Sequence, residues 1–181
     1  YLGPEHNGVQ LAVDPREPLP FAGPGSDVYR EEQRAEFALL NRLSRLAAVE
    51  YPDDPVAQAR IKSYELAFGM QRAVPAALDL ASETAEIQKR YGIDNDVTRP
   101  FGRQCLAARR LVERGVRFVQ IFHGGGGGGA WDAHGGIKQN HTTLAAQVDL
   151  PIAGLLQDLK RRGMLERTLL LNGFSKTYGM T

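Results

Sequence analysis

The sequence predicts an α/β fold, in which helices are layered on a parallel sheet. The segment 117–122, rich in β-branched and aromatic residues, has the composition of a strand and is followed at once by a run of glycines. A second strand is predicted at 168–171. Between the two lies an amphipathic helix with apolar residues three or four positions apart: Leu144, Val148, Ile152, Leu155 and Leu159. Strand, loop, helix and strand in this order are typical of a parallel sheet covered by helices.

The first hundred residues are predicted to add a helical layer to this sheet. Residues 1–28 are rich in proline and glycine and are expected to form an extended arm. Helices are then predicted over 29–50, over the segment after Pro55 that carries Ile61, Tyr64 and Phe68, over 76–90, and from about Pro100 to the glycine at 115. The expected organisation is thus an arm at 1–28, an incomplete α/β domain at 29–169 and a separate tail at 170–181.

Composition and charge exclude several classes of function. The chain has 22 Lys and Arg against 21 Asp and Glu, and it shows no basic cluster interleaved with aromatics, so a nucleic-acid partner is not expected. No apolar run approaches the roughly 20 residues that cross a bilayer. Cys105 is the single cysteine and lies on an apolar helical stripe, so we expect a buried side chain. The sequence starts at Tyr1 without a signal peptide, so we expect a fragment or a processed product.

The stretch HGGGGGGAWDAHGG, residues 123–136, is the strongest candidate for a functional site. Asp132 and His134 are two positions apart, so in extended backbone both side chains project to one side. A carboxylate and an imidazole suit a Zn²⁺-like ion. His123, at the end of the predicted strand, is a weaker candidate ligand, and His141 is a further one.

Three other interpretations of this loop remain open. A phosphate cradle would need the Gly-Lys-Ser/Thr ending of a nucleotide-binding loop, which is absent from the sequence. A flexible spacer accounts for the glycines but not for the Trp-Asp-x-His that follows them. Asp132 and His134 could also serve only in hydrogen bonds within the loop.

Four segments carry a resemblance to a known family. They are SYELAFGMQRAVPAALDLASETAEIQKRYG, FGRQCLAARRLVERGVRFVQIFHGGGG, WDAHGGIKQNH and PIAGLLQDLKRRGML. Together they resemble the sulfatase-like domain-of-unknown-function family (number fifteen-oh-one) of the alkaline phosphatase superfamily, over residues 1 to about 168. The resemblance implies an α/β/α sandwich and hydrolysis of small phosphate or sulfate esters. It also implies a divalent metal (Zn, Ca or Mg) held by Asp132 and His134, with His123 as a weaker match. It also suggests an exported protein.

The sequence departs from this pattern in two places. We can assign no Ser, Thr or modified Cys nucleophile, and Cys105 is not in a Cys-x-Pro-x-Arg setting. The Glu-Phe-Gly-Arg-Thr motif that usually follows the LKRRG helix is absent. We therefore expect a metallohydrolase relative that is inactive as this chain, and keep as an alternative a non-catalytic binding or surface module.

The last residues, NGFSKTYGMT at 172–181, resemble a different family. They are similar to the segment of class I/II aminotransferases in which Ser-Lys-Thr surrounds the lysine that binds pyridoxal phosphate, which here would be Lys176. That cofactor also needs a phosphate cup and a carboxylate facing its ring nitrogen, and nothing upstream resembles them. We therefore expect no pyridoxal-phosphate activity. For the tail we favour a chimeric join near residues 170–172, with a true fusion and a divergent form of the family's own strand and loop as alternatives.

Overall fold

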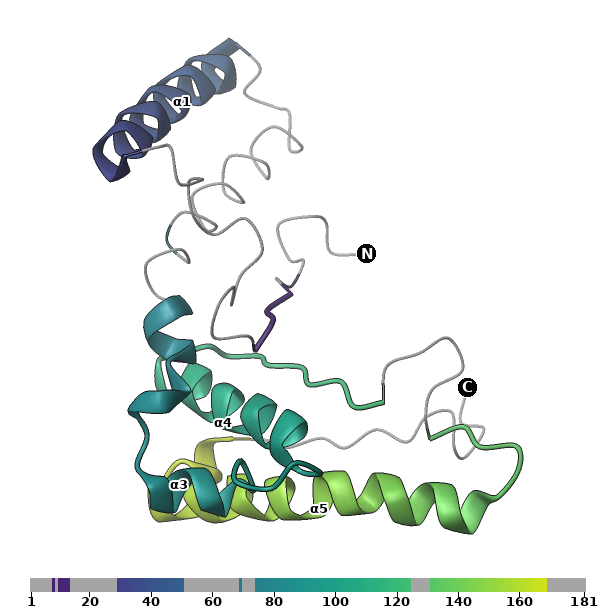
Figure 1. Cartoon of the computed structure of the whole chain (residues 1–181). Coiled ribbons are helices and arrows are strands. Elements are labelled where there is room, and N and C mark those ends of the chain that lie inside the picture. The colour runs from purple at the N-terminus through teal and green to yellow at the C-terminus, as the bar shows by residue number, and fades with distance from the viewer. Residues whose placement is uncertain are drawn as a thin grey trace. The chain divides into compact units, whose positions relative to one another are not determined.

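The computed structural model describes residues 8, 10–13, 29–50, 69, 74–124 and 131–168. The chain divides into two units, Tyr1–Leu78 and Asp79–Thr181 (Figure 1). The candidate site lies in the second unit. Among the described residues, no helix combines the length and the apolar character that a bilayer span requires.

The first unit contains α1, Arg30–Glu50, at the place where the sequence predicts a helix. Glu31 and Glu32 lie in its first turn, where carboxylates interact favourably with the helix dipole. Residues 74–78 are also helical. The helix predicted after Pro55, with Ile61, Tyr64 and Phe68, lies outside the described residues.

The second unit is built on two long helices, α4 (Arg99–Glu113) and α5 (Ile137–Arg161), which pack against each other (Figure 1). Three short elements complete it: the 3₁₀ turn η2 (Leu80–Ser82), the helix α3 (Ala85–Arg90) and the 3₁₀ turn η3 (Leu165–Arg167). Local signals set the ends of these elements. Pro100 occupies the first turn of α4, and Thr84 caps α3 by accepting a 3.3 Å hydrogen bond from the amide of Ile87.

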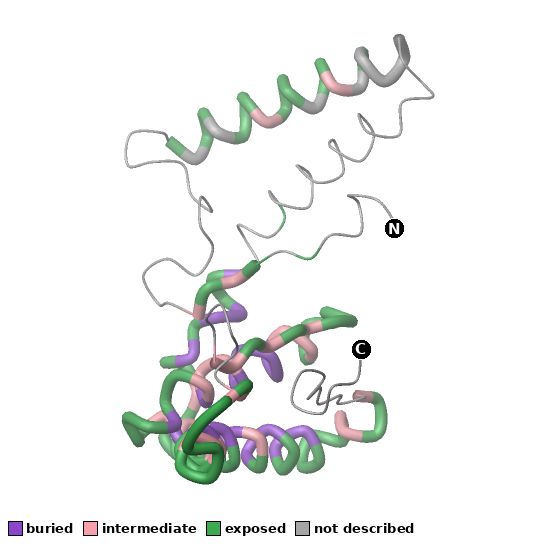
Figure 2. The backbone as a smooth tube through the Cα atoms, turned by 90° about the vertical axis from the view of Figure 1, so that its right-hand side faces the viewer, coloured by how far each residue is buried: buried purple, intermediate pink, exposed green. Residues whose placement is uncertain are grey.

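The core lies between the facing sides of α4 and α5, where buried residues line both helices (Figure 2). Apolar side chains spaced by three and four positions account for it, as the sequence predicts. On α4 they include Cys105, which is 1% exposed, and Ala108; on α5 the buried ones are Leu144, Val148, Leu155 and Leu159.

Two glycines let α4 and α5 approach the end of α3 closely. A Cβ atom on Gly102 of α4 would overlap the carbonyl oxygen of Tyr91, and one on Gly154 of α5 would overlap that of Arg90. Both long helices therefore converge on the same turn of backbone, and Tyr91 is fully buried.

The predicted α/β fold is contradicted by the structure, because the described residues form helices and turns and none forms a strand. The α/β/α sandwich implied by the family resemblance is wrong for the same reason. The predicted strand 117–122 instead runs as an extended trace beside α4 (Figure 1). The second predicted strand, 168–171, lies outside the described residues except for Thr168.

The physical reason lies in what strand propensity measures. Val, Ile and Phe favour extended backbone, but a strand also needs a neighbour to pair with its amide and carbonyl groups. Residues 117–122 form no backbone hydrogen bond with any other described residue. The segment is thus extended, as its composition favours, but it pairs with no other strand among the described residues.

Candidate functional site

Trp131 ties together the two elements that flank the glycine run. Its indole Nε1 donates a 3.1 Å hydrogen bond to Nδ1 of His123, just after the extended segment. Its carbonyl oxygen lies 3.0 Å from Nε2 of His141, on α5. The indole ring also contacts both imidazoles, with centroid separations of 5.8 Å in each case. The residues that immediately follow, including Asp132 and His134, are therefore held close to the beginning of α5.

The hydrogen bonds of His123 define its tautomer. An indole nitrogen can only donate, so Nδ1 of His123 must accept and carries no proton. In the neutral ring Nε2 then carries the proton, and it lies 3.0 Å from Oε1 of Gln147, to which it donates. Phe101 of α4 packs edge-on against the same imidazole at 5.0 Å. Both ring nitrogens are thus engaged, and His123 as arranged offers no free lone pair to a metal.

Asp132 and His134 lie side by side at the surface. Nε2 of His134 is 3.5 Å from Oδ1 of Asp132, a separation at the long end for a hydrogen bond. The His134 side chain is 91% exposed and that of Asp132 is 40% exposed. A carboxylate oxygen and an imidazole nitrogen therefore face each other with solvent around them, and a small cation could reach both.

A third protein ligand is not present in the described part of the chain, where no group of three His, Cys, Asp or Glu side chains could surround one ion. Nε2 of His141 is directed to the Trp131 carbonyl. With two protein ligands, an ion at this position would have to complete its coordination with water or with a substrate oxygen.

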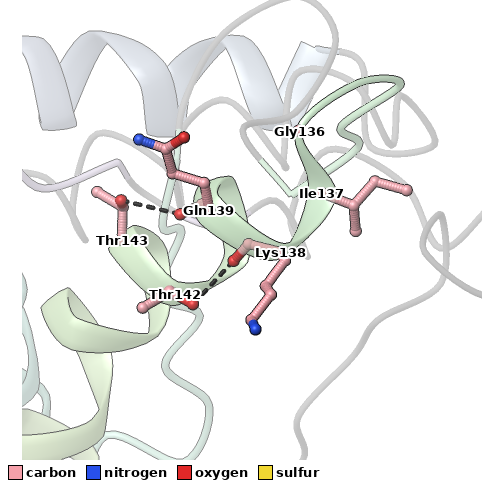
Figure 3. Close-up of a pocket in the computed structure, with 6 residues that line it drawn as sticks. All are labelled: Gly136, Ile137, Lys138, Gln139, Thr142 and Thr143. Atoms are coloured by element: carbon pink, nitrogen blue, oxygen red, sulfur yellow. Dashed lines mark hydrogen bonds between the residues drawn. The ribbon is translucent and has the colours of Figure 1, made fainter.

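A separate open hollow lies over the first turns of α5 (Figure 3). The hydroxyl groups of Thr142 and Thr143 donate back to the carbonyl oxygens of Lys138 and Gln139, at 2.8 and 3.0 Å, so their protons are engaged within the helix. The longer side chains drawn in Figure 3 point in different directions, so no set of polar groups converges there. Neither Asp132 nor His134 lines the hollow.

A buried ion network between α4 and α5 is the strongest electrostatic feature of this unit. Its centre is the side chain of Arg109, which is 1% exposed. Nη1 donates a 2.7 Å hydrogen bond to Glu113. Nη2 lies 2.7 Å from Glu83 and Nε 3.2 Å from Asp158, both as charge contacts outside good hydrogen-bonding direction.

Further groups neutralise each carboxylate of this network. Asp158 accepts hydrogen bonds from the Tyr91 hydroxyl at 3.1 Å and from Nε of Arg162 at 3.0 Å. Arg162 also bonds to Glu113 at 2.9 Å, and Arg110 bonds to Glu83. The network joins η2, α3, α4 and the end of α5, and it accounts for charged side chains in an otherwise apolar interior.

Contacts and burial shift the pKa values of several groups in this unit. Burial raises the pKa of Glu83, but the close contacts and positive charges of Arg109 and Arg110 outweigh it and hold the pKa below the ordinary value of 4.5. Burial, with the charge of Asp158, raises the pKa of Tyr91. Burial alone raises the pKa of the Cys105 thiol to about 12. The thiol is therefore protonated at neutral pH, which suits a core residue and not a nucleophile.

The sequence reasoning missed Arg109, although a signal was present. Arg109 follows Cys105 by four positions and therefore lies on the helix face that was predicted to be buried. A charged residue on such a face requires partners of opposite charge. The candidate Lys176 lies outside the described residues.

Comparison with known proteins places the chain in a family. Residues 1–173 match the model of the family described as Protein of unknown function (DUF1501). The chain therefore belongs to this family. The match ends at Gly173, before the Ser-Lys-Thr triplet that contains Lys176. Searches among curated proteins and among solved structures each gave no match.

Proposed function

We propose that the chain is a relative of metal-dependent phosphate and sulfate ester hydrolases, in which Asp132 and His134 form a two-ligand site for a divalent cation. The observation that carries the proposal is the 3.5 Å approach of the Asp132 carboxylate to Nε2 of His134. Carboxylate oxygen with imidazole nitrogen is a donor set that Zn²⁺ accepts.

The surroundings of the pair support this role. The contacts of Trp131 with His123 and His141 restrain the backbone next to Asp132, so the two ligands need little ordering when an ion binds. Water or an ester oxygen would fill the open positions, and the ion would polarise that oxygen or activate the water. Since no nucleophile can be assigned, we expect ion binding but no ester hydrolysis by this chain.

Zinc titration of the purified chain by calorimetry tests the proposal. Asp132→Ala and His134→Ala should each lower the Zn²⁺ affinity by at least about tenfold, because loss of a direct ligand costs no less than loss of a supporting group. Asp149→Ala removes an exposed carboxylate of α5 and is the matched control, with unchanged affinity expected. Circular dichroism of every variant checks that the helices are intact.

Equal zinc binding by all four proteins would refute the proposal. In that case Asp132 and His134 would be a surface pair of a non-catalytic module, in which the loop carries no chemistry.

A further inference from the structure

The segment 117–122 exposes a regular apolar face. The side chains of Phe118 and Phe122 are 77% and 72% exposed, and Gln120 between them is exposed too. Val119 and Ile121, at the alternate positions, are partly covered. This alternation, with a period of two residues, is that of a strand with one covered face. Because its backbone groups bond to no other described residue, the segment also has open edges that a second strand could use.

The order of residues in this segment is symmetric about Gln120. Read in either direction, the sequence from Phe118 to Phe122 runs aromatic, β-branched, Gln, β-branched, aromatic. When two copies pair antiparallel about Gln120, Phe118 of each lies opposite Phe122 of the other, and the two glutamines lie opposite each other. Cross-strand pairs of aromatic residues stabilise a ribbon. An interface between two identical copies requires this kind of self-complementarity.

We propose that residues 117–122 form a strand-addition site whose occupant is the same segment of a second copy of this chain, antiparallel and centred on Gln120. Pairing covers Phe118 and Phe122 and gives the backbone groups of the segment partners that no other described residue provides. The ribbon is short and buries less than the roughly 1,200 Å² of a standard interface. The dimer is therefore weak and reversible, and its population rises with protein concentration.

Disulfide trapping of the full chain tests the register. Across the twofold axis, the Cα atoms of paired Gln120 residues would be about 5 Å apart, within the range that a disulfide spans. The two Phe118 residues would be about 14 Å apart, because they are offset by four positions. Gln120→Cys should therefore form a covalent dimer under mild oxidation, while Phe118→Cys should not. The double variant Phe118→Cys/Phe122→Cys should again form one.

The natural Cys105 is 1% exposed and gives little background in this assay. Sedimentation of the chain without introduced cysteines provides a second measurement, independent of the folding of the cysteine variants. Phe122→Lys should shift the protein to monomer, and Val97→Lys, at another exposed apolar residue, should not.

Three results would overturn the proposal. Equal trapping of Gln120→Cys and Phe118→Cys would indicate nonspecific association or a parallel arrangement. A chain that stays monomeric at the highest soluble concentration has no such dimer. A monomer in which the amides of 117–122 resist hydrogen exchange would show that the segment is covered by its own chain.

Discussion

Replacement of Arg109 by methionine tests whether the buried ion network holds α4, α5 and η2 together. Methionine keeps the unbranched apolar stem of the side chain but removes the guanidinium charge that faces Glu83, Glu113 and Asp158. Breaking a buried ion pair by removing one partner costs about 3–5 kcal/mol. Each carboxylate here keeps a second cationic partner, Arg110 or Arg162. We therefore expect Arg109→Met to lower the free energy of unfolding by about 3 kcal/mol, the lower end of that range.

Urea unfolding followed by circular dichroism measures this loss, and its pH dependence identifies the cause. The pKa of Glu83 is held below 4.5 in the folded chain, so its ion pairs stabilise the fold fully at pH values above 4.5. This stabilisation is lost as the pH falls through the lowered pKa. The difference in the free energy of unfolding between the natural chain and Arg109→Met should therefore shrink as the pH falls below 4.5. Arg161→Met is the control, because Arg161 is mostly exposed and lies 3.7 Å from Glu86. A neutral or stabilising Arg109→Met would refute the reasoning, since the carboxylates would then not need the charge.

Two further outcomes follow from the packing of the second unit. Gly154→Ala should lower the free energy of unfolding by about 1–3 kcal/mol, because the added methyl group overlaps the Arg90 carbonyl oxygen. Gly135→Ala, where an added Cβ meets no atom within 4 Å, should leave the free energy of unfolding nearly unchanged in the same urea titration. Equal losses of free energy in the two variants would contradict the close approach of α5 to α3. Cys105 should not react with a thiol reagent in the folded chain at neutral pH and should react once urea unfolds it, because it is buried and its pKa is raised to about 12. Rapid labelling of the folded chain would show that the core between α4 and α5 is open.

Local signals in the sequence predict α1, α4 and α5 well, whereas the single helix predicted over 76–90 is interrupted between residue 78 and α3. Proline near the beginning of α4, glycine after its end and the apolar spacing of α5 each act within one or two turns, and α4 and α5 lie where these signals indicate. The burial of Cys105 was predicted from the same periodicity and is confirmed. These features depend on neighbouring residues alone, so tertiary context changes them little.

Features that depend on distant partners could not be predicted in this way. The composition of 117–122 favours extended backbone, but whether another strand lies beside it is a property of the rest of the molecule. Arg109 contacts carboxylates that lie far apart in the sequence, Glu83 just after η2 and Asp158 near the end of α5. No spacing rule connects these two positions. For the candidate site, the sequence suggested that Asp132 and His134 project to one side, and they approach to 3.5 Å. Their role as metal ligands stays a prediction.

The position of Trp131 gives the protein an optical reporter of its own. It is the only tryptophan of the chain, and its ring lies between the imidazoles of His123 and His141. All indole emission therefore originates at the junction between the extended segment and α5, next to Asp132. A shift in colour or intensity would register any rearrangement of that junction without an attached dye.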